Sequence, residues 1–247
     1  MFLPGSTTLT SVLGHQSDEI ETSGLIGNFV PTAGIASTHW TNQAASNALR
    51  RFNGITHNNS APHNFQFDGS DDYLGEASSG YGGSSFGVNT YNNFTMAQWY
   101  KHRAGYRHVP FSLTYSGSDL ITVWTGQRVL NKMSVSNDQA AHIDFSDYTF
   151  SDNTWYYIAL VRDGSTYSFF VNGSFVGSGT LATQGVDPAL FQVGATGVTG
   201  TTYTQSGLKV GHIHVHSTAL KNSQIRQNML ASHDINDARI YGSTYTA

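Results

Sequence analysis

Runs of apolar, β-branched and aromatic residues between positions 155 and 177 are separated by two turn dipeptides, Asp163-Gly164 and Asn172-Gly173. Such dipeptides favour the two-residue turns of β-hairpins, because their positive φ angles match the twist of the paired strands. The pattern predicts three consecutive antiparallel strands, Trp155–Arg162, Ser165–Val171 and Ser174–Gly177. Both faces of the first strand are apolar, so we expect it to lie centrally in a sheet that is covered on at least part of each side.

Similar runs continue along the chain, and clusters of turn residues separate them. They are Leu25–Ile35, Phe94–Lys101, Val109–Tyr115, Leu120–Thr125, Gln127–Val135, His142–Phe145 and Leu208–His216. Turn signals at intervals of roughly 8–12 residues are typical of a sandwich or jelly roll. The sequence therefore predicts an all-β fold, a two-sheet antiparallel β-sandwich of the jelly-roll type with one or two short helices.

Two segments have helical character. The composition of Thr41–Arg51 favours a short helix, which Thr41 or Asn42 could cap. Ser223–Ser232 carries apolar residues at helical spacing, and Asn222 or Ser223 could cap it. No repeat of 20–50 residues is present. We expect one domain over residues 25–233, an N-terminal arm or edge strand at 1–24 and a C-terminal tail at 234–247.

Four segments resemble, in chain order, the motifs of laminin-G-like, or concanavalin A-like, jelly-roll domains. Phe67–Leu74 (FDGSDDYL) resembles an early strand entry of that family, and Phe94–Lys101 (FTMAQWYK) resembles a later strand. Residues 155–173 resemble the central hairpins, and Val210–Leu220 resembles the closing strand. The resemblance spans roughly residues 65–233. It implies the jelly-roll fold of a family that contains lectins and glucanases.

The composition narrows the classes of partner. A chain of 247 residues with 38% hydrophobic content can bury a sizeable core. Only 11% of residues are charged, the formal net charge is −4 and basic runs are absent from the sequence, which argues against nucleic acid and anionic membranes as partners. No run approaches the roughly 20 apolar residues of a membrane-spanning helix.

The chain has no cysteine, so disulfides and thiolate chemistry are not available to it. Its first residues lack the basic region and the sustained apolar core of a Sec signal. Laminin-G-like modules, which the motifs resemble, usually work outside cells. We therefore expect a protein that is made in a cytosol and reaches a virion surface, or the extracellular space, by non-Sec release.

A carbohydrate site needs aromatic faces for stacking and polar groups for sugar hydroxyls. The candidate residues are Trp99, Arg103, Tyr106, Tyr115 and Trp124. Alternation along a strand allows at most one of Trp99 and Tyr100 to face an open groove. Packing in the core is the alternative for each of these aromatic side chains.

Three aspartates, Asp68, Asp71 and Asp72, supply clustered carboxylates of the kind that Ca²⁺ prefers. The alternative is that Asp68 bonds to its own turn, as such residues do before glycine, while Asp71 and Asp72 are solvated. Calcium is the one possible cofactor; otherwise we expect none.

Three histidines, His212, His214 and His216, alternate along one predicted strand and point to one face. Imidazoles at this spacing could share a transition metal. The favoured interpretation is a polar outer face of the sheet, because no cysteine or acidic residue lies nearby in the sequence. If the histidines met at a subunit interface, low pH would charge them and weaken it.

Glycoside hydrolysis requires two carboxyl groups that flank the bond. The glucanases of the resembling family carry them on a Glu-x-Asp-x-Glu strand. This chain has three glutamates, Glu19, Glu21 and Glu76, and none lies in such a strand. We therefore do not expect an enzyme.

These observations predict a non-catalytic structural or binding protein. The first hypothesis is a virus-particle surface component, such as a capsid decoration or fibre subunit, whose partners are other subunits of an assembly. The polar first 24 residues could anchor it. The alternative is a carbohydrate-binding lectin or adhesin that recognises surface glycans.

Overall fold

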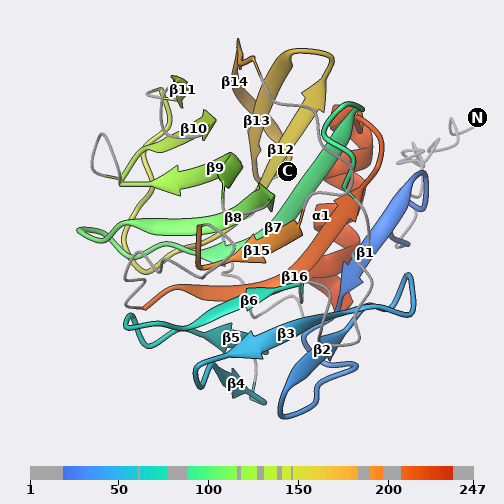
Figure 1. Ribbon diagram of the computed structural model, residues 1–247, viewed down its shortest axis with the longest axis vertical. Helices are drawn as coiled ribbons and strands as arrows, with labels where there is room; N and C mark the ends of the chain where they lie inside the picture. The colour runs from blue at the N-terminus through green and yellow to red at the C-terminus, as the bar shows by residue number, and fades with distance from the viewer. Residues whose placement is uncertain are drawn as a thin grey trace, which may run out of the picture.

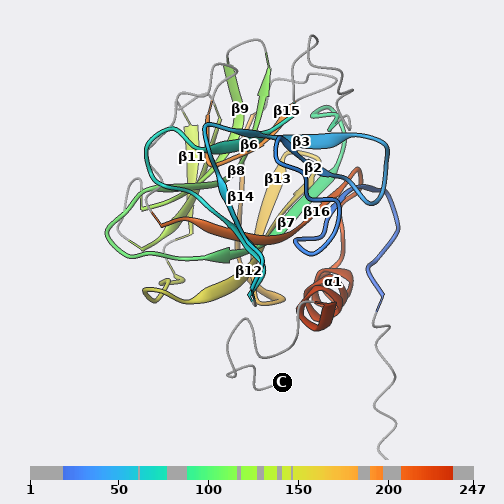
Figure 2. The same ribbon diagram turned by 90° about the horizontal axis from the view of Figure 1, so that it is seen from below.

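In the computed structural model, two β-sheets face each other and a helix lies against the outside of one of them (Figures 1 and 2). The structure describes residues 19–60, 62–76, 88–115, 118–126, 131–137, 141–145, 147–182, 190–196 and 207–235. Within these ranges, no helix is both long and apolar enough to cross a membrane.

The first sheet contains eight strands of the described residues, in the order β14–β13–β12–β7–β16–β5–β4, with β1 beside β16. Their bounds are β1 Leu25–Phe29, β4 Thr56–Asn58, β5 Asn64–Gln66, β7 Phe94–Lys101, β12 Trp155–Asp163, β13 Thr166–Val171, β14 Ser174–Thr180 and β16 Lys209–His216. Strand β16 changes partners along its length: its first residues pair with β5 and its last residues pair with β1.

The second sheet also contains eight strands within the described ranges, in the order β11–β10–β9–β8–β15–β6–β3–β2. Their bounds are β2 His39–Thr41, β3 Ala48–Phe52, β6 Tyr73–Gly75, β8 His108–Tyr115, β9 Ser118–Thr125, β10 Met133–Asn137, β11 Ala141–Phe145 and β15 Leu190–Val193. The two sheets form the antiparallel sandwich that the sequence predicts, so the all-β fold class is confirmed.

The three consecutive strands expected around residues 155–177 are present as β12, β13 and β14. Gly164 and Gly173 have φ angles of 61° and 73°, as primed hairpin turns require. Strand β12 lies between β13 and β7. Its residues Ile158 and Leu160 are buried between the sheets, and Tyr157 is buried on the opposite face. The predicted central position, covered on both sides, is confirmed.

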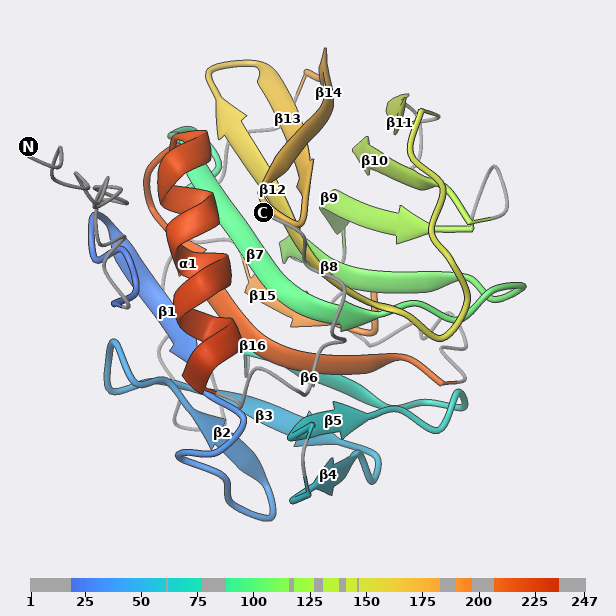
Figure 3. The same ribbon diagram turned by 180° about the vertical axis from the view of Figure 1, so that it is seen from behind.

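The helix α1 (Asn222–Ile235) covers the outer face of the first sheet and lies along β7 and β16 (Figure 3). Ile225 and Met229 of the helix pack with Trp99 and Tyr157 in a second apolar cluster, separate from the core between the sheets. The indole N–H of Trp99 also donates to Ser232 Oγ at 2.9 Å. The outer face of the first sheet is therefore an interior surface.

The helix predicted at Ser223–Ser232 is confirmed, but its cap lies one residue earlier than expected. The Lys221 carbonyl accepts the first helical hydrogen bonds, from the N–H groups of Gln224 and Ile225. The Gln224 side chain accepts the Lys221 N–H at 2.8 Å in return. This reciprocal bond fixes Lys221 as the capping residue.

The helix predicted at Thr41–Arg51 is wrong, because this segment forms the hairpin of β2 and β3. Trp40 and Leu49 lie opposite each other in the hairpin, and both are fully buried in the core. The Asn42 Oδ1 accepts the N–H of Ala44 at 2.9 Å and so forms a turn. Burial of the two apolar side chains has overridden local helix propensity.

Residues 19–24 lie against α1. The Glu21 N–H donates to Asn228 Oδ1 at 2.7 Å, and the Gln227 side chain donates to the Glu19 carbonyl at 2.8 Å. The last part of the predicted arm is thus packed on the domain. Residues 1–18 of the arm and 236–247 of the predicted tail lie outside the described residues.

Candidate functional site

Two pockets lie at opposite ends of the three central strands β12, β7 and β16. One is lined by residues just before β7, at the end of β12 and just after β16. The other is lined by residues at the end of β7, just before β12 and at the start of β16. We call them the Tyr91 pocket and the cationic pocket. Strand ends of this kind commonly carry binding residues on a rigid scaffold.

The Tyr91 pocket has a volume of about 620 Å³ and is lined by Tyr91, Asn92, Asn93, Asp163, Ser217, Thr218 and Ala219. The Tyr91 side chain is 69% exposed. Asn89 holds the turn beneath it: its side chain accepts the Tyr91 N–H at 2.8 Å, and its carbonyl accepts the Asn92 N–H at 3.2 Å. The turn therefore presents the aromatic ring at its tip.

Hydrogen bonds fix the polar wall of the Tyr91 pocket. The Asn93 side-chain amide donates to Asp163 Oδ1 at 2.8 Å, and its oxygen accepts the Gly164 N–H at 2.9 Å. The hydroxyls of Ser217 and Thr218, which also line the pocket, donate to the Gly24 and Ser23 carbonyls at 3.2 and 3.3 Å. An exposed aromatic ring beside pre-positioned amide, carboxylate and hydroxyl groups is suited to a sugar.

The cationic pocket has a volume of about 310 Å³ and is lined by Gln66, Lys101, His102, Arg103, Asp152, Asn153, Gly207 and Lys209. Burial lowers the pKa of Lys101, and the nearby charge of Lys209 lowers it further. Burial also lowers the pKa of His102, so this imidazole adds no charge near neutral pH. Three cationic side chains therefore face one carboxylate.

The structure separates the five residues expected at a carbohydrate site. Trp99 is 5% exposed and lies beneath α1. Trp124 is fully buried, and its indole N–H donates a hydrogen bond to Ser136 Oγ at 3.0 Å. Neither ring is open to a sugar, so these two predictions need correction. Periodicity identifies the face of a strand and not what covers that face, and α1 lies more than a hundred residues beyond Trp99.

The other three expected residues are at the surface. The Arg103 guanidinium lies over the Tyr106 ring, 4.4 Å from its centre, and Arg103 lines the cationic pocket. Tyr106 is 38% exposed. Tyr115, which is 47% exposed, ends β8 in the second sheet and lines neither pocket.

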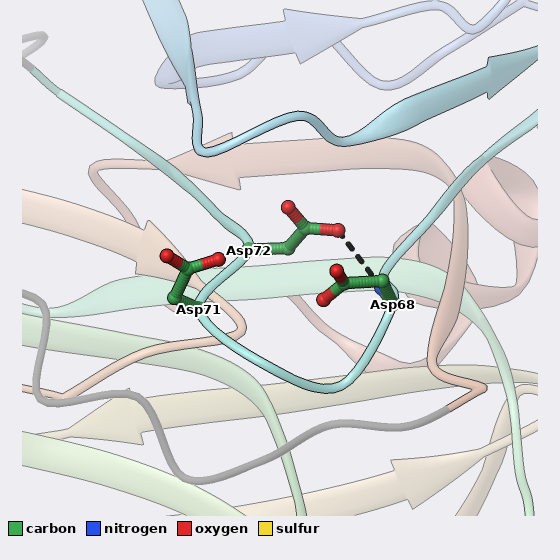
Figure 4. Close-up of side chains that lie close together, drawn as sticks. All are labelled: Asp68, Asp71 and Asp72. Carbon is green, nitrogen blue, oxygen red and sulfur yellow. Dashed lines mark hydrogen bonds between the residues drawn. The ribbon is translucent and has the colours of Figure 1, made fainter.

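Asp68, Asp71 and Asp72 lie together in the turn between β5 and β6 (Figure 4). One carboxylate oxygen from each lies within 4.8 Å of the others. Asp68 Oδ1 accepts the Ser70 N–H at 2.7 Å, which matches the turn alternative, and Asp72 Oδ2 accepts the Asp68 N–H at 2.8 Å.

Asp72 departs from the turn alternative because it is buried rather than solvated. Burial raises the pKa of its carboxyl; the bond from the Asp68 N–H opposes this, and the charges of Asp68 and Asp71 add to it. Its Oδ1 has no hydrogen-bond partner in the described part of the chain. A bound cation would pair this oxygen and favour the ionised carboxylate, so the three residues fit a calcium ion.

The three histidines of β16 lie on the outer side of the sheet, as expected, but they are fully buried there. The His212 and His214 rings lie 4.2 Å apart between their centres. Burial lowers the pKa of His212 to about 3 and lowers those of His214 and His216 as well. They form a neutral row beneath α1 and beside β1.

The glutamates occupy structural positions. Glu76 is buried, and its Oε2 accepts the Phe191 N–H at 2.9 Å. Glu19 and Glu21 belong to the segment packed on α1. The three glutamates therefore do not share a strand, as the sequence indicates.

A family model described as the concanavalin A-like lectin/glucanases superfamily matches residues 74–226. The chain belongs to this superfamily. The match lies within the segment that carries the motif resemblance, and it agrees with the sandwich and with the position of its central strands. No curated protein matches the sequence.

Solved structures of low identity share the fold of this superfamily domain. Trypanosoma rangeli sialidase aligns with a TM-score of 0.64 and 16% identity, over 87% of this chain and 34% of the sialidase. The binding domain of Paraclostridial Mosquitocidal Protein 1 aligns with a TM-score of 0.61 and 11% identity, over 83% of this chain and 52% of that one. The binding domain of botulinum neurotoxin DC, in complex with SialylT, gives 0.61 and 10%, over 84% and 52%.

This superfamily domain thus spans about a third of the sialidase and about half of the toxin binding domains. At these identities the likeness shows the fold alone.

Sequence reasoning missed Tyr91, Asp163 and Lys209 as pocket residues. Each pocket combines segments that lie far apart in the chain and meet only because β7 pairs with both β12 and β16. One local signal was present: Tyr91 is a single aromatic residue among asparagines directly before the strand at Phe94. Such a turn presents its aromatic side chain outward.

Proposed function

We propose that the protein binds carbohydrate, without catalysis, through the Tyr91 pocket. The observation that carries this proposal is the exposed Tyr91 ring beside the fixed polar groups of Asn93 and Asp163. Membership of a superfamily that includes lectins supports it. Structures that share the fold are solved in complex with sialic acid, for the Trypanosoma rangeli sialidase, and with SialylT, for the botulinum neurotoxin DC binding domain.

The chemistry of the Tyr91 pocket favours a neutral sugar. The ring face can stack on the apolar face of a pyranose. The Asp163 carboxylate accepts hydrogen bonds from hydroxyl groups and would repel a carboxylate or sulfate at the same place. Because Asn93 already holds Asp163 in position, little ordering is needed when the ligand binds.

The test is a glycan-array assay with the wild-type protein and the Tyr91→Ala variant. We expect defined glycan binding by the wild type and a loss of about tenfold or more in the variant, because 1.4 kcal/mol corresponds to tenfold and a central aromatic contact is commonly worth more than 1 kcal/mol. Tyr115→Ala is the matched control, since Tyr115 is also an exposed tyrosine but lies in the second sheet. Equal losses in both variants, or no binding by the wild type, would refute the proposal.

The glycan-array assay and a thermal melt, each run with calcium and again with EDTA, test the aspartate turn. Asp68, Asp71 and Asp72 would hold the ion, which would order this turn without taking part in a reaction. Binding of calcium should raise the melting temperature of the wild type, and Asp72→Asn should remove that rise. An unchanged melting temperature in calcium would leave the three residues as turn structure.

The assembly role remains a prediction. Its proposed anchor, the N-terminal arm, is described only from residue 19, where it packs on α1. Residues 19–24 do not line the Tyr91 pocket, but Ser217 and Thr218 in its wall donate to the Gly24 and Ser23 carbonyls, so glycan binding and anchoring would meet at neighbouring residues.

A further inference from the structure

Two lysines lie side by side at one end of the first sheet. Lys101 ends β7, Lys209 begins β16, and the two are directly opposite in the antiparallel register. Directly opposite residues project from the same face, with their Cβ atoms about 4.5–5.5 Å apart. Like charges in such a pair destabilise a sheet. Burial and then the charge of Lys209 lower the pKa of Lys101, and the nearby Asp152 carboxylate opposes this effect.

The flanking positions of the same row do not neutralise this pair. Trp155 of β12 lies opposite Lys101, and Gln66 of β5 lies opposite Lys209. One neighbour is aromatic and the other is an amide, so neither supplies a negative charge. The row therefore places two cations beside the hydrogen-bonding amide of Gln66.

Arg103 adds a third cation to the same pocket. Its side chain lies across the backbone of Gly207, where a Cβ atom would be only 2.6 Å from Arg103 Cδ. The absence of a side chain at position 207 thus leaves room for the Arg103 side chain. A planar guanidinium with parallel N–H donors suits carboxylate and sulfate oxygens.

Among the described residues that line the pocket, Asp152 supplies the one carboxylate, and its own loop already uses it. Asp152 Oδ1 accepts the N–H of Ala104 at 2.8 Å. Lys101, Lys209, Arg103 and Asp152 together give the described lining of this cavity of about 310 Å³ a formal charge of +2. A cavity of this size holds a group such as one acidic sugar residue.

We propose that the cationic pocket is a second ligand site, which binds the carboxylate or sulfate group of an acidic glycan through Lys101, Lys209 and Arg103. That the group is carried by a glycan rests on the proposed function; the anion site itself does not. The ligand would relieve the repulsion between the two lysines, and that repulsion would account for a like-charged pair in register.

The test is isothermal titration calorimetry at constant ionic strength with three probes: sodium glucuronate, sodium sulfate and glucose. We expect the wild type to bind at least one of the two anions and not glucose at this site. Lys101→Met and Lys209→Met should each weaken anion binding about tenfold or more, because each keeps the aliphatic stem and removes one charge. Binding of glucuronate alone would identify a carboxylate site, and binding of sulfate alone a sulfate site.

Two controls distinguish the possible failures. Lys221→Met removes the same charge from the exposed start of α1 and should leave anion binding unchanged. Tyr91→Ala should also retain it, even if the glycan proposal for the Tyr91 pocket fails. The Met variants should melt at or above the wild-type temperature, since they relieve repulsion, so lost binding would not reflect lost folding.

Absence of binding by both anions would overturn the inference and would leave glycan binding at the Tyr91 pocket untouched. Anion binding that persists in both Met variants would overturn it as well.

Discussion

Gly194, directly after β15, is a residue at which the backbone permits no side chain. Its φ angle is +86°, and a Cβ atom would lie 2.6 Å from the Phe67 ring and 3.2 Å from the Asp72 carbonyl oxygen. Phe67 is fully buried and Asp72 contributes backbone, so neither neighbour can give way. The second sheet and the turn with the three aspartates meet at this point.

We therefore expect Gly194→Ala to lower the free energy of unfolding by about 2–5 kcal/mol, combining positive-φ strain of roughly 1–2 kcal/mol with overpacking of roughly 1–3 kcal/mol. Gly105→Ala is the matched control: its φ is +82°, and a Cβ atom there would meet nothing within 4 Å. Urea denaturation of both variants measures the difference. Equal destabilisation would mean that the contact with Phe67 relaxes freely.

Single residues were predictable from the sequence when local chemistry determined them. The positive φ angles at Asn172 and Gly173 follow directly from their turn dipeptide. The other turn lies one residue later than predicted, at Gly164 and Ser165, because Asp163 pairs with Thr166. The burial of Trp99 and the three histidines could not be predicted from local chemistry, because α1 covers them. Alternation correctly placed Trp99 and Tyr100 on opposite faces, and yet both faces are interior.

The histidine row links β16 to its covering elements. The Nδ1–H of His216 donates to the Ser23 carbonyl at 3.0 Å, and its Nε2 accepts an N–H of the Asn228 amide at 3.1 Å. Asn228 Oδ1 in turn accepts the Glu21 N–H. His216 therefore joins β16, α1 and the segment before β1 only in its neutral form, because a proton on Nε2 would face the amide donor.

This arrangement predicts lower stability in mild acid. Burial holds the folded-state pKa values of His212, His214 and His216 below the ordinary histidine value of about 6.5. Above pH 6.5 both states are neutral; below it the unfolded chain takes up protons that the folded protein excludes. The free energy of unfolding should fall by up to about 1.4 kcal/mol per pH unit for each histidine that stays neutral.

Denaturation between pH 7.5 and 5 measures this fall, in a range where carboxylates contribute little. The His216→Gln variant should have a shallower pH slope than the wild type. A free energy of unfolding that is equal at pH 7.5 and pH 5 would contradict the prediction.

Elements were predictable where pattern and turn chemistry agreed. Strands β7, β12 and β13 and the helix α1 lie close to their predicted bounds. The segment Thr41–Arg51 failed because its composition favours a helix, while Trp40 and Leu49 are buried as a cross-strand pair. Local propensity could not reveal that contact.

For the molecule as a whole, α1 completes a third layer over the sandwich (Figures 2 and 3). Without it, the apolar residues of the outer cluster, including Trp99, Tyr157 and Phe170, would lie on an open sheet face. A chain that ends at residue 220 should therefore aggregate or bind a hydrophobic dye, since large contiguous apolar patches are rarely stable in water.

Size-exclusion chromatography and dye fluorescence test this expectation. A chain that ends at residue 235 keeps α1 and serves as the control for shortening. A chain without α1 that stays monodisperse and folded would show that the helix is not part of the domain's core.

The positions of the two pockets have a consequence for long ligands. They lie at opposite ends of β7, whose eight residues span about 23 Å. The helix between them, with 14 residues, is about 21 Å long. A linear polysaccharide with neutral and acidic units could run beside α1 and occupy both sites, so that its second contact becomes intramolecular. Its avidity would then exceed the affinity of any single sugar by a factor on the order of 10² or more. Short fragments that reach only one pocket would be released quickly, and the protein would select polymers by length as well as by composition.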